Sequence, residues 1–311
     1  MRPLAIVSLH ASPLAALGAG ENGGMNVYVR AVCEELSRRG IPTEVFTRRA
    51  SPDGPERVRL HQDSWVTQVE AGEPRPVDKG RLLDLLPAFT DGVLRQARYV
   101  PDGYSLIHSH YWLSGWTAVR LAAEWDLPWF HTAHTLARVK NERAASGAVL
   151  EPDHRIAVEQ AVVREADRLI ASSVSEAEDL VRLYAADRRR LAVVPPGVDL
   201  RIFTPRPADA LRRRLGLEGM RTIVFAGRLE RLKGAEIVLR ATAILAAQGV
   251  GSGRLALVLA GEDSQNGMLE SSALGGERAR LEALARDLSI ADRVRFTGAV
   301  DQRTLAGLLA L

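Results

Sequence analysis

The chain has 311 residues, of which 46% are hydrophobic and 25% are charged, and its net charge is +3. These values are typical of a folded protein long enough for two domains, and they exclude an intrinsically disordered chain. The small net charge argues against a nucleic-acid partner, and no apolar run is long enough to predict a transmembrane segment. The single cysteine, Cys33, excludes an internal disulfide and favours a reducing, cytoplasmic location.

Strand-like and helix-like segments alternate along the first 200 residues. Short apolar runs predict strands at Leu4–His10, Thr43–Thr47, Ser105–His110, Pro128–Ala133, Arg168–Ser172 and Leu191–Val194. Amphipathic spacing predicts helices at Asn26–Arg39, Lys79–Arg98, Arg155–Asp167 and Ser175–Tyr184. This alternation predicts an α/β protein with a doubly wound parallel sheet and helices on both faces.

Two proline-rich segments, Pro195–Gly197 and Pro205–Pro207, predict a domain boundary. The alternation then restarts, with strands at Thr222–Ala226, Leu255–Ala260 and Val294–Thr297 and helices at Ala235–Gln248, Glu277–Leu288 and from Gln302 onward. We therefore expect one domain over residues 1–200 and a second over residues 201–311. Three strands make only the first half of a doubly wound sheet, so the second domain is expected to be incomplete.

A glycine-rich loop follows the first predicted strand. Gly18–Gly23 matches the dinucleotide pattern G-x-G-x-x-G, but it begins some distance after the strand. Thr47–Arg49 stand where an acidic residue would bind a ribose diol, although Arg48 suits a 2′-phosphate, so NADP binding is kept as an alternative. The Gly23-Gly24 pair opens a predicted helix, whose positive end favours an anionic or sugar ligand.

Four of the seven histidines lie at or just after the ends of two predicted strands, namely His108, His110, His131 and His134. Ligands of doubly wound sheets bind at the carboxyl ends of strands, so hydrogen bonds to a sugar are expected here. Zinc is an alternative, but no cysteine pair or H-E-x-x-H helix accompanies these histidines. A purely structural role for one or two of them is the other alternative.

Candidate anion-binding cations occur in both halves of the chain. Only three of the 41 basic Lys and Arg residues are lysines, Lys79, Lys140 and Lys233. Arg228 and Lys233 follow a predicted buried strand, where they could hold a diphosphate. Arg155 and Glu159 have helical i, i+4 spacing, for which a solvated ion pair worth about 0.3–0.5 kcal/mol is the alternative.

Together these motifs resemble retaining glycosyltransferases of family 4, which have the GT-B fold. The resemblance is carried by Gly23–Tyr28, His108–Trp112, His131–Leu136, Pro196–Asp199, and Gly227–Leu229 with Lys233-Gly234. It implies two Rossmann-like domains, the first for the acceptor and the second for a nucleotide sugar. The most similar members transfer N-acetylglucosamine from UDP-N-acetylglucosamine to 1D-myo-inositol 3-phosphate in mycothiol biosynthesis.

The resemblance also implies roles for individual residues. Donor binding is expected from His10, Gly24, Arg228 and Lys233. Acceptor binding is expected from the loop Glu21, Asn22, Gly23, Gly24, Met25 and Asn26, and from Lys79, Tyr111, Thr135 and Arg155. His134, Arg228 and Lys233 are expected to serve catalysis without a protein nucleophile. Glu21-Asn22 and Ala16-Leu17 depart from the family pattern in this loop.

The resemblance implies no metal and no cofactor on these residues. A Mg²⁺ site is left open for a part beyond Leu311, where the E-x7-E carboxylates of the family belong. The expected partners are a UDP-sugar and an inositol phosphate, without nucleic acid, and a homodimer is one option for the assembly. The chain by itself is expected to be poorly active. A different inositol-containing or sugar-phosphate acceptor, and an inactive binding fragment, remain as alternatives.

Overall fold

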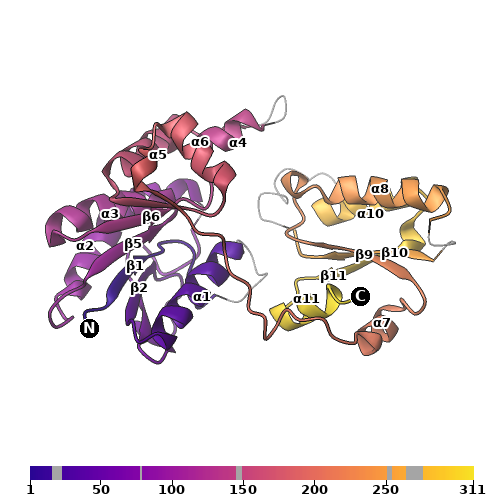
Figure 1. Cartoon of the computed structure of the whole chain (residues 1–311), viewed down its shortest axis with the longest axis horizontal. Helices are drawn as coiled ribbons and strands as arrows, with labels where there is room; N and C mark the ends of the chain where they lie inside the picture. The colour runs from indigo at the N-terminus through magenta and orange to yellow at the C-terminus, as the bar shows by residue number, and fades with distance from the viewer. Residues whose placement is uncertain (16–22, 78, 145–148, 251–253, 264–275) are drawn as a thin grey trace. The chain divides into compact units, whose positions relative to one another are not determined.

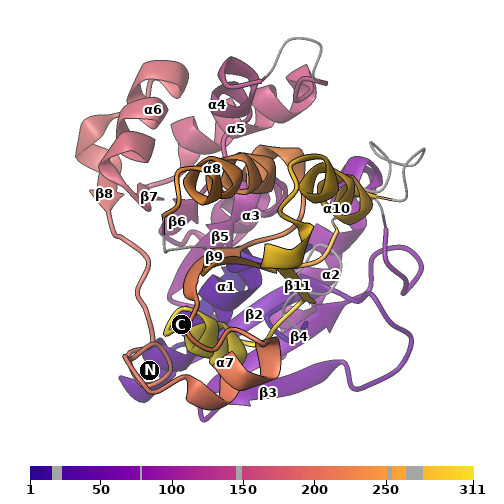
Figure 2. The ribbon, with the colours of Figure 1, turned by 90° about the vertical axis from the view of Figure 1, so that its right-hand side faces the viewer.

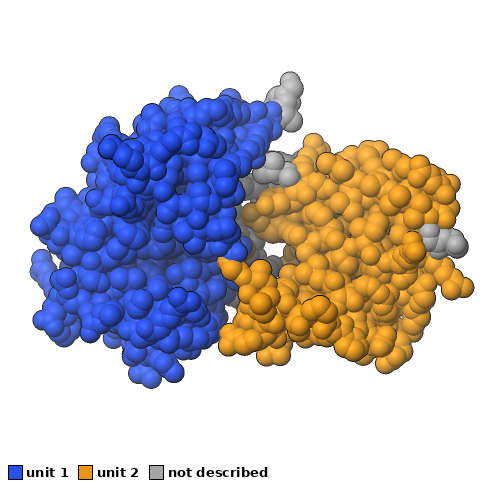
Figure 3. Space-filling model, in the orientation of Figure 1, with its two compact units in different colours: residues 1–15, 24–196 blue, residues 16–23, 197–311 orange. Residues whose placement is uncertain are grey.

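The computed structural model describes residues 1–15, 23–77, 79–144, 149–250, 254–263 and 276–311. The chain divides into two compact units (Figure 3), residues 1–15 with 24–196 and residues 16–23 with 197–311. Each unit is an α/β structure built on its own sheet (Figure 1). Among the described helices, none combines the length and apolar character needed to cross a membrane.

The first unit contains one sheet with the order β3-β4-β2-β1-β5-β6-β7-β8, parallel except for the antiparallel pair β3–β4. Its strands are β1 (Leu4–Val7), β2 (Thr43–Arg48), β3 (Arg57–His61), β4 (Ser64–Val69), β5 (Leu106–His110), β6 (Trp129–Thr132), β7 (Arg168–Ala171) and β8 (Leu191–Val193). Its helices are α1 (Gly24–Arg38), α2 (Leu86–Ala97), α3 (Tyr111–Trp125), α4 (Ala137–Glu142), α5 (Asp153–Glu165) and α6 (Val174–Tyr184), with 3-10 turns at Lys79–Arg81, Leu83–Leu85 and Arg188–Arg190.

The alternation of side chains along the strands positions these helices. In β1, Ile6 faces the cluster that α1 covers, whereas its neighbours Ala5 and Val7 face the larger cluster beneath α2 and α3. All three side chains are fully buried, as expected for a parallel strand covered on both faces. Helices α4, α5 and α6 pack on one another beyond the β6–β8 end of the sheet (Figure 2).

Three parts of the first unit are missing from the sequence prediction, namely the hairpin β3–β4, helix α3 and the short helix α4. The hairpin β3–β4 is not among the predicted strands, because β3 is a largely exposed edge strand whose sequence Arg57–His61 alternates with arginine. Helix α3 is also missing from the prediction. Its first half is largely buried, and its exposed face mixes Arg120 and Glu124 with the apolar Val119 and Ala123, so the amphipathic pattern is weak.

The second unit has a three-stranded parallel sheet with the order β11-β10-β9. Its strands are β9 (Arg221–Ala226), β10 (Leu255–Ala260) and β11 (Val294–Gly298), and its helices are α7 (Asp209–Leu215), α8 (Ala235–Ala247), α10 (Glu277–Asp287) and α11 (Gln302–Leu308), with 3-10 turns at Arg231–Lys233 and Ala291–Arg293. Every residue of the central strand β10 is buried, since α8 and α10 cover one face and α7 and α11 the other (Figure 1).

Candidate functional site

The neighbouring strands β5 and β6 carry histidines that link them inside the core. His108 Nε2 lies 2.9 Å from Thr132 Oγ1, and Ser109 Oγ lies 2.8 Å from His131 Nδ1. Burial lowers the pKa of His108 and of His131 to about 3, so both rings are neutral at neutral pH. These two histidines therefore have a structural role, which was one of the alternatives open from the sequence.

His110 and His134 form a second pair at the carboxyl edge of the sheet. His110 Nδ1 lies 3.0 Å from His134 Nε2, and the ring of Tyr28 packs edge-on against His134 with a centroid distance of 5.2 Å. Burial holds the pKa of His110 well below its ordinary value and lowers that of His134 to about 4. One imidazole must therefore donate a proton and the other accept it. Among the described residues, the buried Nε2 of His110 has no hydrogen-bond partner.

Tyr111 follows His110 in the chain and contacts His10. The ring centroids of His10 and Tyr111 are 4.7 Å apart. Tyr111 and His134 both have positive φ, 72° and 60°, which is uncommon for residues with a side chain. Backbone in this conformation persists where the surroundings impose it and is found disproportionately at functional sites.

Arg155, from the first turn of α5, joins Tyr111 and Thr135. Its Cζ lies 5.0 Å from the centroid of the Tyr111 ring, and its terminal NH2 group donates to Thr135 Oγ1 at 3.1 Å and to the Thr135 carbonyl at 3.4 Å. The structure thus brings together three of the four residues outside the glycine-rich loop that were predicted to bind the acceptor. The fourth, Lys79, begins a 3-10 turn, and its side chain lies outside the described part of the molecule.

Two carboxylates neutralise Arg155. Its Nε donates to Glu159 Oε1 and its NH1 to Glu151 Oε2, both at 2.8 Å. Burial alone would lower the pKa of the guanidinium, but Tyr111, Glu159 and Glu151 together raise it above its ordinary value. The solvated ion pair considered from the sequence is therefore wrong, because Arg155 and Glu159 are only 3% and 4% exposed.

Glu159 is itself held by groups other than Arg155. Its Oε2 accepts a hydrogen bond from the backbone N–H of Ala137 at 2.9 Å, at the start of α4, and a short one from the hydroxyl of Tyr184. Sequence reasoning paired Glu159 with Arg155 but not as a buried partner, and it missed Glu151 and Tyr184 as supports of Arg155. The i, i+4 spacing of both glutamates from Arg155 was the available signal, but it does not distinguish a buried network from surface pairs.

The start of α1 contains the described part of the predicted acceptor loop. Gly24 is the first residue of the helix, and its first turn carries no acidic side chain. Asn26 is buried and its Nδ2 donates to the carbonyl of Ser12 at 2.8 Å, while Met25 packs against the cluster beneath α1. Gly23 precedes the helix. Glu21 and Asn22 lie outside the described residues.

In the second unit, Arg228 and Lys233 flank one carboxylate. Arg228 NH2 lies 3.5 Å and Lys233 Nζ 3.9 Å from Glu230 Oε1, and the cations are 33% and 47% exposed. Gly234, with φ of 77°, is the N-cap of α8, which begins at Ala235. Two partly exposed cations next to a helix N-terminus form an arrangement suited to a diphosphate.

The backbone of the loop that carries Arg228 is joined to the next loop of the sheet. The N–H of Gly227 donates to the carbonyl of Ala260 at 2.9 Å, and that of Leu229 to the carbonyl of Glu262 at 2.8 Å. A Cβ on Gly261 would lie 1.8 Å from the Gly227 oxygen, and Gly261 has φ of 152°. Only glycine permits this approach of the two backbones.

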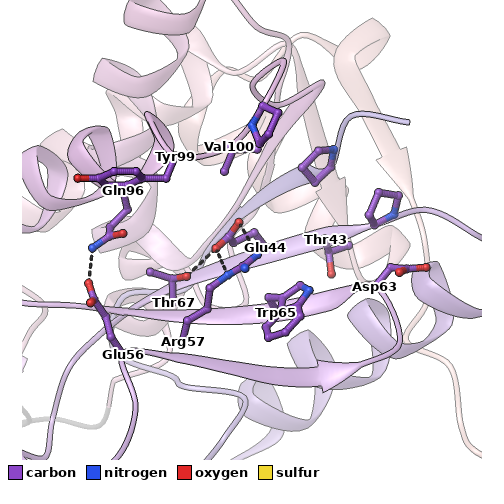
Figure 4. Close-up of a pocket in the computed structure, with 13 residues that line it drawn as sticks. Thr43, Glu44, Glu56, Arg57, Asp63, Trp65, Thr67, Gln96, Tyr99 and Val100 are labelled. Carbon is purple, nitrogen blue, oxygen red and sulfur yellow. Dashed lines mark hydrogen bonds and ion pairs between the residues drawn. The ribbon is translucent and has the colours of Figure 1, made fainter.

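A hollow of about 450 Å³ lies at the opposite, amino-terminal edge of the first sheet (Figure 4). The buried Glu44 carboxylate accepts hydrogen bonds there from Arg57 Nε at 3.0 Å, Thr67 Oγ1 at 2.6 Å and the Tyr104 hydroxyl at 3.2 Å. The guanidinium of Arg57 also lies 4.3 Å from the ring centroid of Trp65. Because these contacts satisfy the Glu44 carboxylate, the hollow offers no unpaired charge from that residue.

Within the described ranges, no group of three metal-ligating side chains is placed to hold a metal ion.

Comparison with known proteins places this architecture in a class of transferases. The family model described as Glycosyltransferase Family 4 matches residues 22–202, and that described as Glycosyl transferases group 1 matches residues 208–310. The chain belongs to glycosyltransferase family 4. It is 44% identical over 306 residues to the D-inositol 3-phosphate glycosyltransferase of Thermobispora bispora, covering 97% of this chain and 70% of the relative. The enzyme of the same name from Actinosynnema mirum is 44% identical over 299 residues, covering 95% and 70%.

Solved structures confirm the predicted GT-B fold. Sucrose-phosphate synthase from Thermosynechococcus elongatus matches with a TM-score of 0.85 and 29% identity, covering 100% of this chain and 73% of that chain. Anabaena HepE in complex with UDP-glucose matches with a TM-score of 0.70 and 16% identity, covering 99% and 71%. The predicted family is confirmed as well, so the dinucleotide-dependent oxidoreductase considered from the sequence finds no support.

Proposed function

We propose that the chain belongs to a retaining glycosyltransferase that moves N-acetylglucosamine from UDP-N-acetylglucosamine to 1D-myo-inositol 3-phosphate, as in mycothiol biosynthesis. The convergence of Arg155, Thr135 and Tyr111 at the carboxyl edge of the first sheet carries this proposal. A guanidinium beside a hydroxyl suits the phosphate of an acceptor. The names of the relatives at 44% identity support the same acceptor.

The proposal assigns the acceptor phosphate to the first unit. Lys79, Tyr111, Thr135 and Arg155 would bind its phosphate, and the residues from Glu21 to Asn26 would contact its ring. Phosphate oxygens receive strong, charge-assisted hydrogen bonds from Lys and Arg, whereas a neutral polyol receives only weaker ones. Binding at this site should therefore depend strongly on the phosphate.

The donor would use cations of the second unit. Arg228 and Lys233 would bind the diphosphate of the nucleotide sugar and stabilise the charge that develops as UDP leaves. His10 and Gly24 would complete donor binding, and His134, neutral at neutral pH, would hydrogen-bond a sugar hydroxyl. The acceptor hydroxyl would attack from the face that UDP leaves, so the α configuration is kept without a protein nucleophile. The proposal uses no cofactor or metal on these residues.

The decisive experiment measures transfer and stereochemistry together. The protein is incubated with UDP-N-acetylglucosamine and 1D-myo-inositol 3-phosphate, UDP release is followed, and the anomeric configuration of the product is read by NMR. We expect an α-linked product and much less transfer to unphosphorylated myo-inositol. A β-linked product would contradict retention, and equal transfer to myo-inositol would contradict the phosphate site. Thermal stabilisation by NADPH but not by UDP would contradict the donor class.

A second candidate is transfer to another inositol-containing or sugar-phosphate acceptor. The likeness to sucrose-phosphate synthase, at 29% identity and a TM-score of 0.85, favours keeping it. Glucose 6-phosphate and fructose 6-phosphate are therefore included as acceptors in the same assay, with UDP-glucose as a second donor. Faster transfer to either sugar phosphate would replace the inositol phosphate in the proposal while keeping the transferase.

A further inference from the structure

Every polar edge of the Arg155 guanidinium is engaged within the first unit. Nε faces Glu159, NH1 faces Glu151 and NH2 faces Thr135. An anion that binds Arg155 at any of these three positions must therefore replace the partner there. Arg155 is 3% exposed and Glu151 is 20% exposed, so of this pair the Glu151 side chain has the greater contact with solvent.

The two carboxylates on Arg155 are held very differently. Each oxygen of Glu159 has a fixed partner, since Oε1 accepts from Arg155 and Oε2 from the Ala137 N–H and the Tyr184 hydroxyl. Releasing Glu159 would leave these buried donors unpaired, which is costly. Glu159 is therefore the fixed partner of the guanidinium.

Asn141 holds the backbone of Glu151, whereas the contacts of its carboxylate are with two cations. Its N–H donates to Asn141 Oδ1 at 2.7 Å, and its carbonyl accepts from Asn141 Nδ2 at 3.2 Å. Besides Arg155, its carboxylate contacts the ammonium of Lys140, which is 41% exposed. The side chain can therefore rotate toward solvent while the Asn141 bonds keep the main chain in place.

The charges favour an exchange of anions at this position. Two cations, Arg155 and Lys140, are balanced by two carboxylates, Glu151 and Glu159. With Glu151 in place, these four side chains have no net charge, and the negative charge of Glu151 itself repels an approaching phosphate. If Glu151 moves away, the phosphate meets two cations and one carboxylate. A dianion interacts with that excess charge more strongly than a monoanion does.

We propose that Glu151 occupies the phosphate position on Arg155 and is displaced by the acceptor phosphate, which makes it a specificity-determining residue. This inference rests on the proposed function, because it takes Arg155 as the phosphate contact. The Glu151 carboxylate would compete with the ligand for Arg155. A dianion would displace it, whereas a monoanion or a neutral polyol would not. The site would thereby select phosphate esters over sugars and carboxylates of similar shape.

The test compares ligand binding by calorimetry in the wild type and in two variants, Glu151→Gln and Glu151→Ala. The probes are 1D-myo-inositol 3-phosphate, inorganic phosphate, glucuronate and myo-inositol. Glu142→Gln is the matched control, since Glu142 pairs with Arg182 at the surface and does not contact Arg155. We expect both Glu151 variants to bind the two phosphate probes about tenfold more tightly, the scale of one lost charge-assisted competitor. Glucuronate binding should appear in the variants, and myo-inositol binding should not change.

Two binding results would contradict the exchange. Weaker phosphate binding in both variants would mean that Glu151 only positions Arg155, and unchanged binding would mean that NH1 is not a phosphate contact. Failure of the proposed function would look different, because transfer to inositol phosphate would be absent while inorganic phosphate still bound more tightly to the variants. If no protein binds any phosphate probe, the exchange and the phosphate-bearing acceptor are both wrong.

Discussion

The two units present their candidate anion-binding cations in opposite ways. In the first unit, Arg155 is nearly fully buried and two glutamates at 2.8 Å neutralise it. In the second unit, Arg228 and Lys233 are partly exposed and share the single carboxylate of Glu230 at 3.5 and 3.9 Å. A buried cation is pre-positioned but needs permanent counter-charges, whereas exposed cations keep their charge available and are held less tightly.

The largest expected effect uses the histidines, all seven of which lie between residues 10 and 154, in the first unit. Burial lowers the pKa of His108 and His131 to about 3 and that of His134 to about 4, below the value of about 6.5 in an unfolded chain. Their contribution to stability is thus present above pH 6.5 and is lost as the pH falls toward 4. The loss is about 1.4 kcal/mol per pH unit for each such histidine.

Tryptophan fluorescence can follow this acid sensitivity, because all five tryptophans also lie in the first unit, Trp65, Trp112, Trp116, Trp125 and Trp129. We expect the fluorescence-detected Tm to fall steeply between pH 6.5 and 5. The remaining part of the circular-dichroism transition, from the second unit, should change little over the same range. A parallel fall of both transitions would contradict the assignment to buried histidines.

The next effect concerns Glu159. The Glu159→Ala variant leaves Arg155 without its fixed partner and leaves the Ala137 N–H and the Tyr184 hydroxyl unpaired. Breaking a buried ion pair costs about 3–5 kcal/mol, so we expect a Tm lower by about 10 °C in the fluorescence transition. Glu142→Ala is the control, since it removes an exposed pair and should shift Tm by less than about 2 °C. Equal shifts in the two variants would mean that the network around Arg155 is not a stabilising one.

A substitution of Arg228 tests the role of the partly exposed cations in the second unit. Its charge would be needed most as the diphosphate leaves, so Arg228→Ala should lower kcat about a hundredfold and raise the donor KM much less. Steady-state kinetics with UDP-N-acetylglucosamine measures both constants. Arg240→Ala provides the matched control, because Arg240 pairs with Glu236 on the surface of α8. A change in KM alone would show binding without preferential stabilisation of the transition state.

The smallest effect is expected for Lys79. If its ammonium binds the acceptor phosphate, Lys79→Ala should raise the acceptor KM about tenfold to a hundredfold, the range for about 1.5–3 kcal/mol of a charged hydrogen bond. UDP affinity, measured by calorimetry, should not change. Weakening of both ligands to the same degree would indicate a structural role for this lysine.

Much of the fold could be predicted from local patterns. Strand β10 was predicted with its observed bounds, because a wholly buried parallel strand is a continuous apolar run. The helix pattern failed at α3, whose exposed face mixes charged and apolar residues, and the strand pattern failed at β3, whose exposed edge carries arginines. Both elements owe their structure to neighbours that local periodicity does not report.

Contacts between polar residues at the ends of neighbouring strands could be predicted from the sequence. Contacts between residues of separate helices, which depend on tertiary packing, could not. His110 and His134 follow neighbouring strands, so their meeting follows from the parallel sheet. The bond between Tyr184 and Glu159, by contrast, joins two helices through tertiary packing. The spacing of Arg155 and Glu159 predicted their pairing but not its burial, because the elements that exclude water from it lie elsewhere in the chain.

The close approach of Gly261 to Gly227 has a mechanical consequence. The loop that carries Arg228 is bonded to the residues after β10, and Gly261 in turn bonds to Gly298 at the end of β11. Backbone hydrogen bonds thus join the carboxyl ends of β9, β10 and β11, and we expect these three strand ends to move together. A side chain introduced at Gly261 would push the backbone of Gly227 away from the end of β10. It would thereby displace Arg228 without contacting the Arg228 side chain. The position of Arg228, the cation proposed to bind the donor, therefore depends on an uncharged contact between two backbones.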